Sequence, residues 1–73
     1  MSSSEPERSI RVTLDSVLQD RDMTLTALSE ATGLTMANLS ILKTGKAKAV
    51  RFTTLAAICE ALECQPGDIL KFA

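Results

Sequence analysis

The sequence contains no histidine and only two cysteines, Cys59 and Cys64. Two cysteines without a histidine cannot supply the four ligands of a tetrahedral zinc site within one chain. We therefore predict no metal site and no cofactor. In a protein that stays in the cytoplasm, both cysteines are expected to be reduced thiols that pack as ordinary core or surface side chains.

Histidine is also the most common general acid or base, and no candidate nucleophile lies beside a base in this sequence. The three glycines are isolated, so there is no glycine-rich loop to cradle a phosphate group. We interpret the following acidic residues as parts of solvated helix faces: Asp15, Asp20, Asp22 and Glu30. The sequence predicts a protein that is not an enzyme, with no catalytic residue and no small-molecule substrate.

Aromatic residues make up only 3% of the chain, as Phe52 and Phe72, whereas hydrophobic residues make up 45%. The core must therefore be built from leucine, isoleucine, valine and alanine, which suits packed helices. Long apolar runs are missing as well, since the longest falls far short of the ~20 residues that span a bilayer. No apolar stretch of the signal-peptide type follows the polar first residues. We expect a cytoplasmic protein that does not contact a membrane.

The chain has room for a single small domain. Residues 1–9 are rich in serine, contain Pro6 and include no apolar residue except Met1, which predicts a flexible N-terminal tail. Residues 10–73 are predicted to form one domain.

The net charge of −1 conceals an uneven distribution of charge. Residues 1–42 carry six acids and three arginines, and residues 52–73 carry three acids and one lysine. Half of the eight basic residues fall in the nine positions between them, where there is no acid: Lys43, Lys46, Lys48 and Arg51. A focused positive patch on an acidic body indicates a polyanionic partner better than the total charge does. The alternative is a patch that only solubilises the surface.

Hydrophobic periodicity and end signals predict four helices and a final helical turn that begins at Pro66. The expected helices cover residues 14–21, 25–32, 36–43 and 53–62. Thr13, Thr24 and Thr35 are the predicted N-caps. Gly33 and Gly45 are predicted to end the second and third helices.

Side chains from every helix are expected to face the core. They are Leu14, Val17, Leu18 and the aliphatic stem of Arg21; Leu28 and Ala31; Thr35, Leu39 and Leu42; and Phe52, Leu55, Ile58, Cys59 and Leu62. Residues 10–13 alternate apolar and polar, so they are either a short strand or an extended lead-in to the first helix. A strand there would be able to pair with residues 71–73 as a small sheet.

Residues 25–44 show the pattern of a helix-turn-helix, in which two short helices flank a glycine turn. Leu28 and Leu39 are spaced to meet across Gly33, and Ser29 is small enough for two helices to cross closely. Leu34 is an apolar residue within the turn, where it can fill the space between the helices. The alternative interpretation is an ordinary helical hairpin of a small bundle.

The stretch TLTALSEATGLTMANLSILKTGKAKAVRFTTLAAICEALECQPGDIL resembles the small Cro-like, phage-repressor-type (XRE) helix-turn-helix regulators of bacteria and phages. The signature combines the glycine turn followed by NLSILKTGK, the helix RFTTLAAIC and the ending CQPGDIL, and the resemblance runs from about Val12 to Leu70. It implies an all-α, lambda-repressor-like bundle of four or five helices. It also implies a transcriptional regulator that places its third helix in the major groove of double-stranded DNA, typically as a dimer.

The resemblance places the base-contacting side chains on the third helix, where Met36, Ala37, Ser40 and Ile41 are expected to face outward. Related repressors commonly carry glutamine or arginine at the first outward positions, and this chain does not. Met36, Ala37 and Ile41 can touch only thymine methyl groups, whereas Ser40 can hydrogen-bond to almost any base. Either sequence specificity is modest, or it comes from DNA shape and the basic loop.

Phosphate contacts are expected from helix ends and from the basic loop. Free N–H groups at the starts of the second and third helices can receive a phosphate, although lysine also suits the C-terminal end of a helix without any DNA. The candidate residues are Thr26, Thr35, Asn38, Lys43, Thr44, Lys46, Lys48 and Arg51.

A homodimer is expected because one small helix in a groove offers too little interface, and two half-sites roughly double it. The predicted dimer surface contains Ile69, Leu70 and Phe72, together with the segment 10–12. The alternative function is a protein-interaction module on the same fold, such as an antitoxin-like or anti-repressor partner. In that case exposed apolar residues, including Met36 and Ile41, would contact protein instead of DNA.

Overall fold

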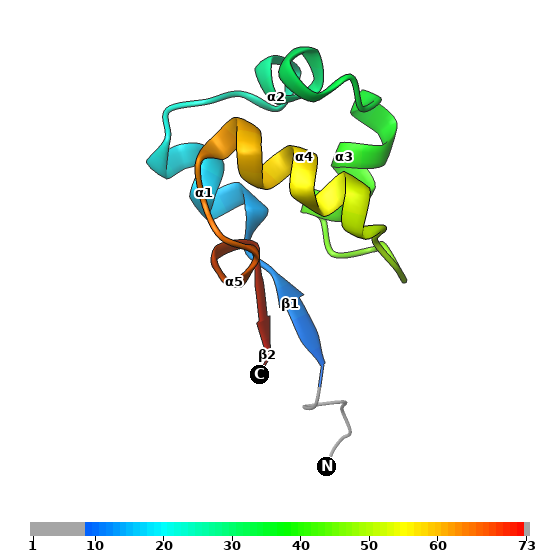
Figure 1. The fold of residues 1–73 in the computed structure, drawn as a ribbon. Helices are drawn as coiled ribbons and strands as arrows, with labels where there is room; N and C mark the ends of the chain where they lie inside the picture. The colour runs from blue at the N-terminus through cyan, green and yellow to red at the C-terminus, as the bar shows by residue number, and fades with distance from the viewer. Residues whose placement is uncertain (1–8, 73) are drawn as a thin grey trace.

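The structure is a computed structural model that describes residues 9–72. Its elements follow in the order β1 (Ile10–Val12), α1 (Leu14–Asp20), α2 (Leu25–Thr32), α3 (Met36–Lys43), α4 (Phe52–Leu62), α5 (Pro66–Ile69) and β2 (Leu70–Phe72). The helices gather around one core, and the two strands project together at one end (Figure 1). The predicted all-α bundle with a short terminal strand pair is confirmed. Apart from Ser9, the predicted N-terminal tail lies outside the described residues.

The ends of the helices follow the local signals in the sequence. α1 ends one residue earlier than predicted, and α4 begins one residue earlier, at Phe52. Gly33 ends α2, as predicted, with φ at +77°, in the left-handed region that favours glycine. α5 begins at Pro66, and the Asp68 carboxylate accepts a hydrogen bond of 2.9 Å from the Gln65 N–H.

Two of the three predicted threonine caps form. The Oγ1 atoms of Thr24 and Thr35 accept hydrogen bonds from backbone N–H groups three residues later, at 3.0 and 3.1 Å. Thr13 occupies the N-cap position of α1, as predicted, but its side chain does not cap the helix, because its Oγ1 donates to the Asp68 carbonyl at 2.7 Å. Its N–H also donates to the Ile69 carbonyl, at 2.6 Å. Thr13 therefore precedes α1, where its carbonyl accepts the Val17 N–H at 3.3 Å, and also joins the end of β1 to α5.

Residues 10–12 form a strand, whereas Thr13 alone is a lead-in to α1. β1 and β2 pair antiparallel, with Ile10 opposite Phe72, Arg11 opposite Lys71 and Val12 opposite Leu70. The predicted pairing with the end of the chain is confirmed, although β2 already begins at Leu70 and Ala73 lies outside the described residues. This pairing brings the two ends of the described chain together.

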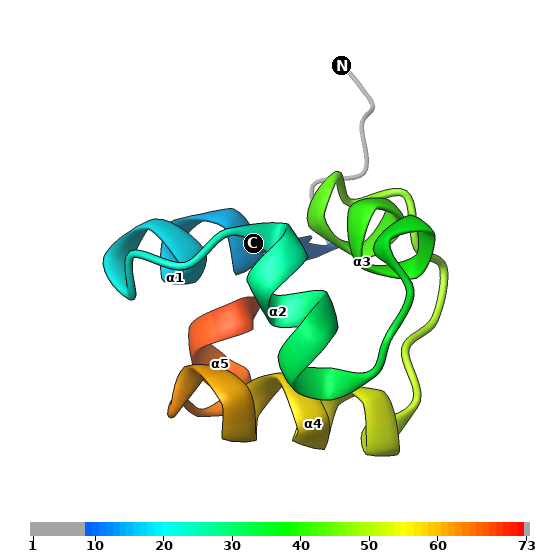
Figure 2. The same ribbon diagram turned by 90° about the horizontal axis from the view of Figure 1, so that it is seen from above.

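The core is aliphatic and takes side chains from all five helices. Its fully buried members include Leu28 and Leu39, which lie on either side of the glycine turn as predicted, and Leu34 packs half-buried against them. α2 crosses over the bundle, with α1 on one side and α3 on the other (Figure 2). The buried side chains are Leu14, Val17, Leu18, Leu28, Leu39, Leu42, Leu55, Ile58, Leu62 and Ile69.

Several residues predicted to face the core do not. Phe52 is 85% exposed, because it is the first residue of α4 and extends past the turn of the helix at which Leu55 enters the core. Thr35 is exposed because it serves as the N-cap of α3, and Ala31 lies on the exposed side of α2. Arg21 is not held by a buried stem: its Nε donates to the Leu62 carbonyl at 2.8 Å.

One residue of the predicted dimer surface lies in the core instead. Ile69 has no exposed surface, because α5 packs its last residue against the helices while β2 leads the chain outward. Ile69 is therefore removed from any interface. Among the described residues, no helix is long and apolar enough to cross a membrane.

Candidate nucleic-acid interface

α3 exposes more than half of its residues. Only Leu39 and Leu42 are buried, and Lys43 is half-buried. Met36 and Ile41 are 43% and 47% exposed, so the outer side of α3 carries two large apolar side chains. The exposed residues are Met36, Ala37, Asn38, Ser40 and Ile41, and they include every residue predicted to contact bases. Because the core needs only two side chains of α3, this surface is available to a partner.

Side-chain hydrogen bonds hold the turn that presents α3. The Ser29 Oγ donates to the Leu34 carbonyl at 2.5 Å. The Thr32 Oγ1 donates to the Leu28 carbonyl at 2.7 Å and accepts from the Leu34 N–H at 3.2 Å. Ser29 was predicted to matter for its small size, and its hydroxyl also holds the turn by this hydrogen bond. These bonds fix the path of the chain between α2 and α3, which sets the angle at which α3 leaves the bundle.

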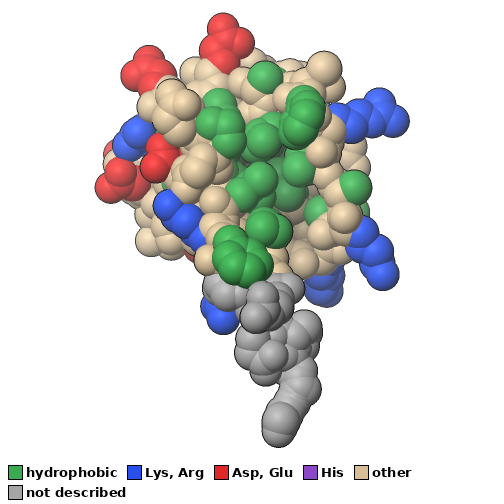
Figure 3. Space-filling model, turned by 60° about the horizontal axis from the view of Figure 1, so that its bottom comes forward, with side chains coloured by type: hydrophobic (Ala, Val, Ile, Leu, Met, Phe, Trp, Pro, Cys, Tyr) green, Lys and Arg blue, Asp and Glu red, His purple; other side chains and the backbone are tan. Residues whose placement is uncertain are grey.

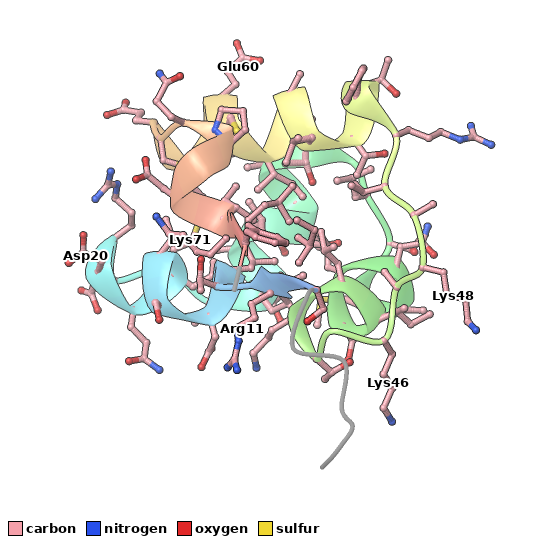
Figure 4. The ribbon with its side chains drawn as sticks, turned by 90° about the horizontal axis from the view of Figure 1, so that it is seen from below. Arg11, Asp20, Lys46, Lys48, Glu60 and Lys71 are labelled. Carbon is pink, nitrogen blue, oxygen red and sulfur yellow. The ribbon has the colours of Figure 1, made fainter. Side chains whose placement is uncertain are left out.

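The connection between α3 and α4 carries exposed cations beside α3. Lys46, Lys48 and Arg51 are exposed and form no ion pair with any described residue. Lys46 and Lys48 point away from the body of the molecule, whereas Asp20 and Glu60 lie far from them (Figure 4). Asp20 and Glu60 are therefore separated in space from Lys46 and Lys48.

Lys43, also predicted to contact phosphate, has a partner within the protein. Its Nζ lies 3.7 Å from the Oδ1 of Asp15 on α1, and the other oxygen of Asp15 accepts a hydrogen bond of 3.1 Å from the Gln19 side chain. Sequence reasoning missed Asp15 as a part of this region. No local signal links residues that are so far apart in the sequence.

The polar residues predicted to contact phosphates at the helix ends are all exposed. They differ in whether their hydrogen-bond donors are already used within the protein. Thr26 lies in the first turn of α2, and the Thr35 Oγ1 already accepts the Asn38 N–H. The Thr44 hydroxyl donates back to the carbonyls of Ser40 and Ile41, at 2.9 and 3.2 Å, so its hydrogen is engaged at the end of α3. The donors that remain for a phosphate are the side-chain amide of Asn38, the hydroxyls of Thr26 and Thr35, and the first amides of α2 and α3.

A cleft of about 490 Å³, which the sequence did not predict, opens between α3 and the connection to α4. Its walls are largely apolar, and Asn38, Arg51 and Thr54 are its polar lining. The cleft depends on the path of residues 47–51, for which the sequence carries no periodic signal. Within residues 9–72, no group of three or more histidine, cysteine, aspartate or glutamate side chains gathers as a metal site would require.

Comparison with known proteins agrees with this geometry. The family described as the Cro/C1-type HTH DNA-binding domain matches residues 13–73, a range that contains α2, α3 and the basic connection. A protein of Bacillus subtilis (strain 168), named the uncharacterized HTH-type transcriptional regulator YozG, is 64% identical over 63 residues, which cover 86% of this chain and 75% of the relative. No solved structure matches significantly. The chain belongs to the Cro/C1-type helix-turn-helix DNA-binding domain family.

Proposed function

We propose that this protein is a transcriptional regulator that binds double-stranded DNA with α3 in the major groove and the α3–α4 connection on the phosphate backbone. The observation that carries the proposal is the placement of an exposed helix face directly beside Lys46, Lys48 and Arg51. Membership of a DNA-binding domain family and a relative named as a transcriptional regulator support it. Such a regulator acts in the compartment that holds the DNA, which we propose is the bacterial cytoplasm.

The exposed side chains of α3 limit how DNA sequence is read. Met36, Ala37 and Ile41 offer methyl and thioether groups, which pack against thymine methyl groups in the major groove. Ser40 supplies a hydroxyl that donates to or accepts from several bases. We infer a regulator with moderate sequence specificity, in which DNA shape supplies part of the discrimination.

The phosphate contacts are testable through their dependence on salt. If Lys46, Lys48 and Arg51 contact phosphates, the logarithm of the association constant should fall with the logarithm of salt concentration with a slope of about −3 per protomer, and of about −4 if Lys43 leaves Asp15 to make a fourth contact. Fluorescence anisotropy with a labelled random duplex, measured from low to physiological salt, gives this slope. Selection of bound duplexes from a random DNA pool would then identify the preferred site.

A complete absence of DNA binding at low salt would contradict the proposal. The exposed apolar side chains of Met36 and Ile41 would then favour the second candidate function, a protein-interaction module of the same fold. In that case the contact surface would still be α3, but its partner would be a protein.

We also propose that the protein binds DNA as a homodimer through an apolar face. This face is seen in Figure 3, where hydrophobic side chains gather between the strand pair and α4. Ile10, Phe72 and Phe52 are 60%, 70% and 85% exposed, so both aromatic side chains of the chain lie outside the core. Exposed aromatic residues of this kind are enriched in protein interfaces.

The dimer is tested by its mass. Light scattering coupled to size exclusion should report about twice the 7.8 kDa of one chain. Phe72→Glu should return the protein to a monomer without unfolding it, because the side chain is outside the core. A wild-type mass of one chain at the concentrations used for DNA binding would reject the dimer and leave the DNA proposal standing.

A further inference from the structure

The C-terminal end of α4 brings the two cysteines of the chain together. Glu63 adopts the left-handed conformation, with φ 52° and ψ 53°. The Cys64 N–H then donates to the Cys59 carbonyl at 3.0 Å, and the Glu63 N–H donates to the Glu60 carbonyl at 3.3 Å. These two bonds define a Schellman motif, which places the side chain after the turn against the side chain five residues earlier. The backbone itself therefore pairs Cys59 with Cys64.

The paired thiols are accessible and reduced. Both cysteines are free and half-buried. Burial raises the pKa of the Cys64 thiol, the neighbouring Cys59 and Asp68 raise this pKa further, and the cation of Arg21 lowers it. Cys64 is therefore a protonated thiol at neutral pH. A protonated thiol attacks oxidants slowly, which disfavours formation of a disulfide, whereas a metal ion can displace the proton.

We propose that Cys59 and Cys64 form a two-coordinate site for one soft monovalent cation, of the class of Cu(I) or Ag(I). Thiolate sulfur selects soft cations, and a linear site of two sulfurs needs no further ligand. Two cysteines are too few for a tetrahedral zinc site, but they are enough for an ion that binds only two ligands. The proposal is independent of DNA binding, because both ligands lie at the end of α4 that is remote from the basic connection.

The binding step balances without any redox partner. Each thiol releases one proton to solvent, two sulfur–metal bonds form, and the product carries one negative charge. Arg21 is positioned to compensate this charge, because its guanidinium is already held at the end of α4 by the carbonyls of Leu62 and Glu63, at 2.8 and 3.2 Å. Two carboxylates oppose this compensation because they add negative charge nearby. They are Asp68 of α5, near Cys64, and Asp20 of α1, which lies 2.9 Å from the Arg21 guanidinium.

The test uses Ag(I), which needs no reductant, added to the full chain in anaerobic, thiol-free buffer. We expect one ion per chain by calorimetry, with an ultraviolet absorption band from sulfur-to-metal charge transfer. Cys59→Ser and Cys64→Ser should each lower the affinity at least a hundredfold. Met23→Leu and Met36→Leu, which remove the other soft sulfur atoms of the described chain, should leave affinity and stoichiometry unchanged.

Three results would overturn the site. They are wild-type affinity in either serine variant, one ion shared by two chains, or complete conversion of the wild-type pair to a disulfide during purification in air. If the serine variants do not fold, X-ray absorption of the wild-type chain loaded with Cu(I) decides the matter. Two sulfur neighbours support the proposal, and nitrogen or oxygen neighbours overturn it.

Discussion

α2 and α3 are alike in sequence signals but differ in how the bundle uses them. Each has eight residues, and each begins at a threonine cap. α2 exposes only Thr26, Glu30 and Ala31, whereas α3 exposes most of its length and yet carries two large apolar side chains on that surface. The fold therefore explains why the apolar residues of α2 are present but does not explain the apolar side chains on the outer face of α3. The proposed contact with DNA would explain them.

The largest expected effect tests what the two helices share. Leu28→Ala in α2 and Leu39→Ala in α3 should each lower the free energy of unfolding by about 2–4 kcal/mol, because both side chains are fully buried. Urea denaturation followed by circular dichroism measures the change. Ile41→Ala on the outer face of α3 is the matched control and should change stability by less than about 0.5 kcal/mol. Equal losses in all three variants would show that α3 has no free face.

The next prediction tests what distinguishes α3 and its connection from the rest of the surface. Lys46→Glu combined with Lys48→Glu should weaken binding to all DNA sequences alike and reduce the salt slope by about 2, since each phosphate contact contributes ~0.9. Anisotropy titrations at several salt concentrations measure both quantities. Lys71→Glu, on β2, should leave the slope unchanged. An unaltered slope in the double variant would remove the connection from the interface.

A smaller effect separates the two threonine caps. Thr24→Ala and Thr35→Ala should each lower the free energy of unfolding by about 1 kcal/mol, because each removes the acceptor for one helix N–H. Thr35→Ala should also weaken DNA binding more than Thr24→Ala does, because α3 is proposed to enter the groove whereas the start of α2 offers only phosphate contacts; binding is measured at a temperature where both variants are fully folded. If Thr24→Ala weakens binding as much, α3 is not the helix that contacts DNA.

The smallest expected effect comes from the ion pair between α1 and α3. Asp15→Asn should change stability by less than about 0.5 kcal/mol, because both partners are partly exposed. Lys43 would then be free for a phosphate, so the salt slope should steepen by up to about 1. Asp20→Asn, which breaks the exposed pair with Arg21, is the control and should not alter DNA binding. Weaker DNA binding by Asp15→Asn would mean that the pair positions Lys43 for its contact.

Local signals were sufficient for the bounds of α2 and α3, and contacts between distant residues account for the errors at Thr13 and Arg21. Gly33, Thr24 and Thr35 act within one turn of their own positions, which is why α2 and α3 were predicted with the observed bounds. Thr13 instead bonds a residue 55 positions later, and Arg21 bonds residues 41 and 42 positions later. No periodicity in the sequence records such bonds.

The candidate interface was also predictable where it depends on a single helix and not where it depends on contacts between elements. The exposed face of α3 follows from helical periodicity, because Leu39 and Leu42 fix which side is buried. The pairing of Lys43 with Asp15 and the cleft beside Arg51 could not be predicted, since each depends on where a loop or a neighbouring helix lies in space. The exposure of Phe52 was missed for the same kind of reason: the apolar period of α4 continues beyond the body of the bundle.

The antiparallel pairing of residues 10 and 72 has a practical consequence for protein engineering. A domain fused directly to residue 9 or to residue 72 would begin beside the strand pair, close to Ile10 and Phe72. Such a fusion would test the proposed dimer, because it should weaken self-association before it interferes with α3. A reporter of the proposed dimer is better placed on an exposed position of α1.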